Sequence, residues 1–162
     1  MSIYLHFRAV AMAEIRDDHG WLAAFMFEAW ENRVTEYAAG LSCSINKGWD
    51  FVNDLYTAAA PAADTGVDDP RTLPVYGGRP VPHTPEADPS DPPMMLLEPR
   101  EVSAAARFLS AVSFDELWAV VGATFTAFGW TKEELLHHHR DLEALYGRAA
   151  TAGHAVVKVV WA

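Results

Sequence analysis

The residues with the greatest potential for chemistry stand close together in the segment INKGWDFVNDLY. Asp50 and Asp54 are four residues apart, a spacing that places two carboxylates on one face of a helix. Such a pair can act in acid–base catalysis or bind a cation if the site is enclosed, and it is simply solvated on an exposed face. Between them lies Asn53, and before them Trp49. We expect Trp49 to be largely buried and Asp50 to stabilise the helix N-terminus through the helix dipole.

A second candidate is the run Tyr76, Gly77, Gly78 and Arg79. Two glycines allow the backbone to turn sharply or to approach a ligand, and an arginine there could hold an anion. The alternative is a tight turn whose arginine pairs with one of the many nearby acids. No helix with phosphate-loop or dinucleotide spacing follows, so we expect no cofactor.

Histidines 137–139 and the single cysteine, Cys43, are weaker candidates. Consecutive helical residues point about 100° apart, so three in a row cannot converge on one metal ion, and we expect no metal site. His139 falls on the apolar stripe of its helix. Cys43 precedes the helix of Asp50, and a helix N-terminus can lower a thiol pKa. Because no cysteine–histidine motif surrounds it, we assign no catalytic residue.

Periodicity and capping patterns predict the elements that must position these residues. Residues 3–10 alternate as a strand, and the segment 155–161 is apolar on both faces, as in a central strand covered on both sides. Helices are predicted over 12–19, over 22–41 with a stop at Gly40, over 47–59, and in three further segments. Those three begin at Pro99, at the capping pattern Ser113/Glu116 and at the capping pattern Thr131/Glu134, the last one ending near Gly153.

Nine of the ten prolines lie between residues 61 and 93, among many aspartates. This composition predicts a long irregular loop over 61–93, with 73–76 as an edge strand inside it. Neither flank has a complete set of elements, so we expect one domain over residues 1–162.

The formal net charge of −10 disfavours binding to nucleic acid and to an anionic membrane surface, and it permits a basic partner. One cysteine allows no intramolecular disulfide, which fits a reducing cytoplasm. The first residues lack the pattern of a signal peptide, and no apolar run reaches the ~18 residues of a membrane span. We therefore expect a cytoplasmic protein.

Several segments resemble the YfbM-like proteins, a bacterial family with a domain of unknown function. The motifs that carry the resemblance are MSIYLHFRAV, INKGWDFVNDLYTA, PVYGGRP, EPREVSAAARFLSAVSFDEL and LEALYGRAATAGHAVVKVV. The resemblance implies a mixed, helix-rich α/β fold, with both terminal strands in one small sheet covered by about five helices. It implies no known activity. Many relatives carry Leu-His where Val52 and Asn53 stand here, so a histidine acid–base role is not expected at that point.

No catalytic signature is present, and the leading hypothesis is a non-enzymatic binding domain with an acidic surface and a basic protein as partner, of inhibitor or immunity type. The alternative is a small-ligand enzyme with a polar pocket under the 61–93 loop, using Asp50, Asn53 and Arg79. The candidate ligand- or partner-binding residues are Trp49, Asp50, Asn53, Asp54, Tyr76 and Arg79.

Overall fold

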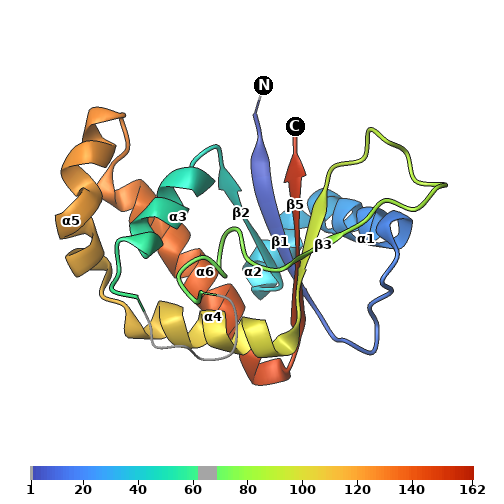
Figure 1. Cartoon of the computed structure of the whole chain (residues 1–162). Helices are drawn as coiled ribbons and strands as arrows, with labels where there is room; N and C mark the ends of the chain where they lie inside the picture. Colours follow the sequence, from blue (N-terminus) through green and yellow to red (C-terminus); the bar gives the residue numbers. More distant parts are fainter. Residues whose placement is uncertain (1, 62–68) are drawn as a thin grey trace.

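The computed structural model describes residues 2–61 and 69–162, and at its centre is a five-stranded sheet in the order β2-β1-β5-β4-β3. All four strand pairs are antiparallel. The strands are β1 (Tyr4–Val10), β2 (Ser42–Asn46), β3 (Arg79–Val81), β4 (Met94–Leu97) and β5 (Ala155–Trp161). The two terminal strands are neighbours, which confirms that they share one sheet. Tyr4 lies opposite Trp161, so the two ends of the chain lie side by side (Figure 1).

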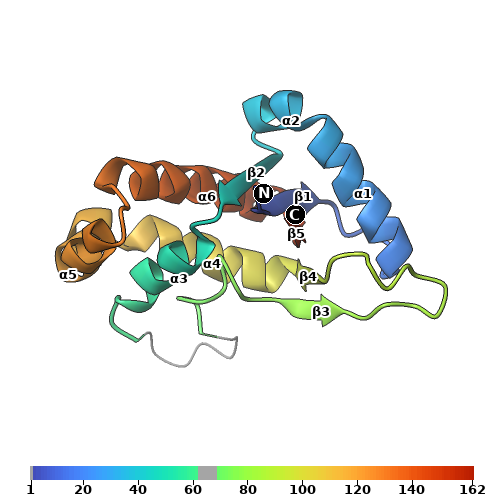
Figure 2. The same cartoon turned by 90° about the horizontal axis from the view of Figure 1, so that it is seen from above.

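Six helices in the described residues cover the sheet: α1 (His19–Glu31), α2 (Arg33–Ala39), α3 (Trp49–Thr57), α4 (Pro99–Ala111), α5 (Phe114–Ala127) and α6 (Lys132–Ala152). Helices α1 and α2 lie on one side of the sheet, and α3 to α6 lie on the other (Figure 2). The larger hydrophobic core joins α3 to α6 to Leu5, Phe7 and Val156, and the smaller one joins α1 to Val157 and Val159. The mixed α/β fold is confirmed.

Strand β5 is central, as its sequence predicts. It pairs with β1 on one side and with β4 on the other. Val156 belongs to one hydrophobic core, and Val157 and Val159 belong to the other. Because both faces are covered, Lys158 is enclosed in the interior, where it is 1% exposed.

Two helix predictions need correction. The helix predicted over 12–19 is absent: residues 12–14 form a turn and residues 15–18 are irregular. The Asp18 side chain accepts a hydrogen bond from Trp21 N at 2.8 Å and so makes α1 begin at His19. The apolar stripe over 22–41 is divided between α1 and α2 at Asn32. There the side-chain amide of Asn32 donates from Nδ2 to Glu28 O at 2.9 Å. This local hydrogen bond competes with a continuous helix. Gly40 ends α2 in the left-handed conformation, as predicted.

The prediction of an edge strand at 73–76 is also wrong. These residues form a turn, and the edge strand β3 follows at Arg79–Val81. Proline at position 80 is tolerated there because an edge strand has one unpaired side. Strand β2 was not predicted. Residues 62–68 of the predicted 61–93 loop lie outside the described residues.

None of the helices in the described part of the chain is long and apolar enough to cross a membrane alone. Helices α4 and α5 pass that test only as a pair, with an 83° bend between them. The bend falls where Ser113 caps α5 by accepting a hydrogen bond from Glu116 N at 3.3 Å, as the capping pattern predicts.

Candidate functional site

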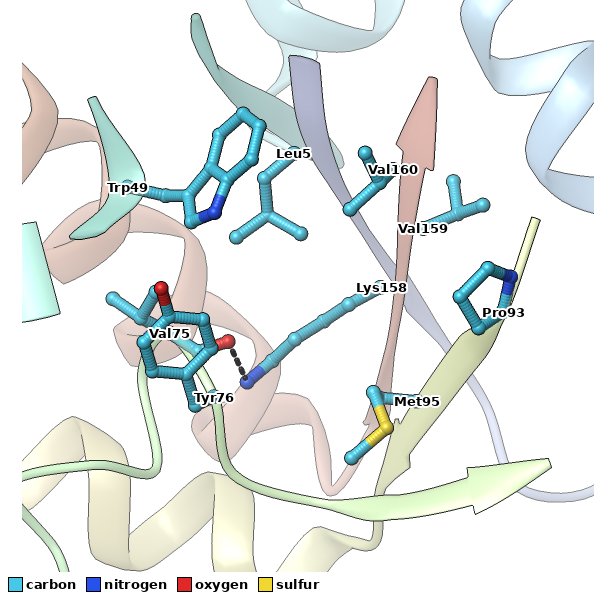
Figure 3. A pocket seen from close by; sticks show the side chains of 9 residues that line it. All are labelled: Leu5, Trp49, Val75, Tyr76, Pro93, Met95, Lys158, Val159 and Val160. Carbon is cyan, nitrogen blue, oxygen red and sulfur yellow. Dashed lines mark hydrogen bonds between the residues drawn. The ribbon is translucent and has the colours of Figure 1, made fainter. Parts of the chain in front are cut away.

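A cavity of about 200 Å³ opens on the side of the sheet that carries α3 to α6 (Figure 3). It lies where β1, β4 and β5 meet the first turn of α3 and the 73–77 turn. We call it the Trp49–Tyr76 pocket, after the two aromatic residues on its wall. Its described lining residues are Leu5, Trp49, Val75, Tyr76, Pro93, Met95, Lys158, Val159 and Val160.

The ammonium group of Lys158 is held by the turn that forms one wall of this pocket. Its Nζ donates to the carbonyl oxygens of Leu73, Val75 and Gly77 at 2.7, 3.0 and 2.9 Å. Burial lowers the pKa of the Lys158 amine, and the charge of Glu101 opposes this. The three carbonyls also favour the charged form, because they accept from every N–H that an ammonium has. A ligand in the pocket therefore meets the aliphatic stem of Lys158.

The glycine pair after Tyr76 makes this turn possible. A Cβ on Gly77 would lie 2.4 Å from the Cα of Leu73, and Gly78 has φ 108°, in the region that favours glycine. A second bond, from Tyr146 Oη to Pro74 O at 2.9 Å, ties the same turn to α6. The turn thus buries Val75 and leaves Tyr76 46% exposed at the pocket.

Trp49 is the first residue of α3, and Asp50 lies in the first turn, as predicted. Trp49 is largely but not completely buried: one part of its side chain packs against the core while another lines the pocket. Two of the predicted ligand- or partner-binding residues, Trp49 and Tyr76, thus lie on the wall of one pocket (Figure 3).

The other four predicted residues do not line the pocket. Asp50 and Asp54 are both exposed on α3. Asn53 is on the buried side of the same helix, and its Oδ1 has no hydrogen-bond partner among the described residues. Arg79 forms a two-bond ion pair with Asp17, at 2.8 and 3.2 Å, and lies 3.6 Å from Glu98. Arg79 therefore pairs with acids, as the second interpretation expects, but it does so from strand β3 and with residues outside the 61–93 loop.

The three consecutive histidines have separate surroundings. His139 is buried on the apolar stripe, as predicted, with its Nδ1 3.1 Å from Tyr56 Oη. His137 is exposed and lies 3.3 Å from Asp141, and His138 is partly buried. Among the described residues, no group of three or more His, Cys, Asp or Glu side chains could hold a metal ion.

Cys43 lies in β2 and not at the N-terminus of α3. Burial raises the pKa of its thiol, and the charge of Asp141 adds to this. The direction is opposite to the one that a helix N-terminus would give, so the thiol is not activated.

Sequence reasoning missed Lys158, Met95 and Pro93. For Lys158 a signal was present, because a lysine within a strand predicted to be covered on both faces must be buried and must find acceptors. For Met95 and Pro93 no local signal exists, since the pairing of β4 with β5 is what brings them to the pocket.

The fold and the pocket define a class: a small mixed α/β domain with an antiparallel sheet between two helical layers and an apolar pocket beside the central strand. The chain belongs to the family described as Domain of unknown function (DUF1877), whose model matches residues 1–159. Its structure is similar to the crystal structure of a protein of unknown function, YfbM from Escherichia coli, with a TM-score of 0.52 and 18% sequence identity over 98% of this chain and 99% of that chain. At this identity the likeness concerns the fold alone. No curated protein matches the chain.

Proposed function

We propose that this protein is a non-enzymatic binding domain that takes an apolar group of its partner into the Trp49–Tyr76 pocket. The observation that carries the proposal is the chemistry of the lining. Of the described lining residues, Lys158 alone is charged, and its ammonium is bound by three carbonyls of the protein. Pockets of this kind bind mainly through apolar contact.

The size of the pocket limits what can enter. A cavity of roughly 150 Å³ lined by apolar side chains is large enough to bind benzene. The Trp49–Tyr76 pocket, of about 200 Å³, therefore has space for one phenyl ring or one leucine-sized side chain. Trp49 and Tyr76 offer ring surfaces against which such a group can pack.

The charge of the protein supports a basic protein as the source of that group. The formal net charge is −10, and the exposed carboxylates of Asp50 and Asp54 lie on the helix that begins with Trp49. An acidic surface beside an apolar pocket would attract a cationic surface and speed the encounter. An inhibitor or immunity protein that covers a basic site would need these features and no catalytic group.

The alternative, a small-ligand enzyme, requires several polar groups to converge in the pocket. The residues that it would use are Asp50, Asn53 and Arg79, and none of them is among the described lining residues. The position of the pocket, with Val75, Tyr76 and Pro93 in its wall, agrees with that alternative, but its apolar lining favours binding.

Methyl NMR with toluene tests the pocket directly. We expect saturable shifts of the Met95 and Val160 methyl signals, because these side chains line the pocket. The Val160→Phe variant fills the space and should abolish the shifts. Val34→Phe, at a position that is 80% exposed on α2, is the matched control and should bind as the wild type does. Equal toluene binding by a folded Val160→Phe variant would refute the pocket assignment.

Binding of short peptides tests whether the partner is basic and supplies an aromatic side chain. We expect Lys-Lys-Phe-Lys-Lys to shift the same methyl signals more strongly than Lys-Lys-Ala-Lys-Lys or Glu-Glu-Phe-Glu-Glu, and to bind more weakly as salt is added. Replacing both carboxylates, in Asp50→Asn with Asp54→Asn, should weaken peptide binding and leave toluene binding unchanged. If the acidic peptide binds as well as the basic one, the proposed basic partner is wrong.

A further inference from the structure

The Trp49–Tyr76 pocket opens where the pairing between β4 and β5 ends. The last pair is Met94 with Val159, and Pro93, the residue before Met94, has no N–H that could extend the ladder. Strand β5 continues past this point, because Val160 still pairs with β1. Val160 therefore has no partner in β4, and both Val160 and Pro93 line the pocket.

Two side chains of the pocket wall carry hydrogen-bond donors that the described part of the chain does not use. The indole N–H of Trp49 has no partner there, and it is not one of the buried atoms that lack a partner, so it is accessible to solvent. The Tyr76 hydroxyl has no partner there either, and its residue is 46% exposed. Figure 3 shows the indole nitrogen on the edge of the Trp49 ring that faces the pocket, and the hydroxyl end of Tyr76 pointing toward Trp49.

The third polar side chain of the described wall, Lys158, has no donor left for a ligand. Its ammonium group has three N–H bonds, and three backbone carbonyl oxygens of the 73–77 turn accept one each. The donors open to an occupant are therefore those of Trp49 and Tyr76. An indole N–H can only donate, so the group that pairs with it must be an acceptor.

A purely hydrocarbon occupant would leave the indole N–H of Trp49 unpaired. Solvent in the mouth of the pocket can hydrate this N–H, and a group that fills the mouth displaces that solvent. A buried donor without an acceptor is costly, so a site with such a donor discriminates against a ligand that cannot pair with it. The favoured occupant therefore combines an apolar body with an acceptor at the end nearest Trp49.

The charge near Trp49 favours a neutral acceptor over an anion. Asp50 follows Trp49 in α3, Asp54 lies one turn further on, and both are exposed. Together with the formal net charge of −10, these carboxylates disfavour an anionic ligand. The carbonyl oxygen of an amide or ketone has no formal charge and has two lone pairs that accept hydrogen bonds.

We propose that the Trp49–Tyr76 pocket is selective for an apolar group that carries a neutral carbonyl oxygen, with the Trp49 N–H as its donor and the Tyr76 hydroxyl as a second. The inference rests on the proposed function and specifies the ligand of the same pocket. The apolar body lies against Met95 and Val160, and the oxygen lies at the aromatic wall. The oxygen can come from the peptide carbonyl of a partner's phenylalanine or from a small aryl ketone.

A matched pair of ligands tests this selectivity by NMR. Acetophenone and α-methylstyrene have nearly the same shape, but only acetophenone has a carbonyl oxygen. We expect acetophenone to move the Trp49 indole N–H signal downfield in a saturable manner, at the concentrations that shift the Met95 and Val160 methyl signals. α-Methylstyrene should shift the methyl signals without the downfield change. The indole signal is assigned by its loss in Trp49→Phe.

The Tyr76→Phe variant tests the second donor, because it removes the hydroxyl and keeps the ring. The ratio of the acetophenone affinity to the α-methylstyrene affinity should fall by about three- to tenfold, the range for one hydrogen bond. Tyr4→Phe is the matched control and should keep the wild-type ratio. Tyr4 packs against Trp30 of α1 and is not a described lining residue of the pocket.

Two results would overturn the inference even if toluene binds: an indole signal that responds equally to both ligands, or an unchanged affinity ratio in Tyr76→Phe. If neither toluene nor acetophenone binds, the proposed function fails and the inference fails with it. Nα-acetyl-phenylalanine amide distinguishes the two sources of the oxygen. If it moves the indole signal as acetophenone does, a peptide carbonyl is the source; if it does not bind, a small aryl ketone is the source.

Discussion

His6 is a buried imidazole that resists protonation. Its Nδ1 accepts from Trp161 Nε1 at 3.3 Å, so the proton of the neutral ring is assigned to Nε2, which has no partner among the described residues. Burial, then the charges of Arg8 and Arg33, lower the pKa of His6 to about 4. In the unfolded chain a histidine pKa is about 6.5. Between those two values the unfolded chain binds a proton that the folded protein does not.

This difference predicts an acid-sensitive fold. As pH falls from about 6.5 to about 4, the free energy of unfolding should decrease by up to about 3 kcal/mol through His6 alone. Urea denaturation at pH 7 and pH 4.5 would show a smaller decrease in His6→Gln than in the wild type. His137→Gln, at an exposed position, should keep the wild-type decrease. An identical pH dependence in His6→Gln would contradict the assignment to His6.

Lys158 is expected to stabilise the fold through the 73–77 turn. In Lys158→Met the aliphatic stem is replaced, but three carbonyl oxygens lose their donor. Leaving them unpaired should cost about 3 kcal/mol or more of the free energy of unfolding. Urea denaturation measures this loss. Lys132→Met removes a surface pair with Asp115 and should cost less than about 1 kcal/mol. Equal losses in the two variants would show that the turn does not depend on Lys158.

At the scale of elements, the start of α3 depends on Gly48. A Cβ at Gly48 would lie 2.5 Å from the Trp130 ring, although the φ of −97° is open to any residue. We therefore expect Gly48→Ala to lower the free energy of unfolding by about 1–3 kcal/mol, through displacement of that ring. In Gly147→Ala a Cβ meets nothing within 4 Å inside α6, and this variant should be more stable by about 0.8–1 kcal/mol. Thermal denaturation separates the two, and destabilisation of both would contradict the steric explanation.

The sequence predicts best those elements whose signals are local. Thr131 and Glu134 do form the capping box that begins α6, and Gly153 ends that helix in the left-handed conformation. Strand β2 was missed because Ser42, Ser44 and Asn46 give it a polar face and leave it only two alternating apolar residues. Such short runs have no clear period.

Only those residues of the candidate pocket that have a local sequence signal were predicted. Trp49 and Tyr76 could be chosen from their own segments, as a tryptophan at a helix start and an aromatic residue before a glycine pair. That the two residues share a pocket could not be predicted, because the pocket depends on where β5 places Lys158 relative to the 73–77 turn. Asp50 and Asp54 have the four-residue spacing of a paired-carboxylate site. They nevertheless lie on the exposed side of α3, where no described element encloses them.

At the scale of the whole molecule, the last strand in the chain is the central strand of the sheet. Strand β5 joins β1 to β4, and no other described strand pair connects the β2-β1 part of the sheet with the β4-β3 part. It also supplies residues to both hydrophobic cores. The two parts of the sheet are therefore joined only when β5 is in place.

This topology predicts the effect of shortening the chain. A protein that ends at Gly153 lacks all of β5, so we expect it to lose cooperative thermal unfolding and near-ultraviolet circular dichroism. Because helix capping and local periodicity remain, much of the helical signal should persist, as in a molten globule. A protein that ends at Val160 keeps every pair between β5 and β4, from Val156 to Val159, and should unfold cooperatively. It should nevertheless be less stable than the full chain, since Trp161 no longer pairs with Tyr4 or donates to His6. Cooperative unfolding of the shorter protein would mean that the helical layers hold the two parts of the sheet together without β5.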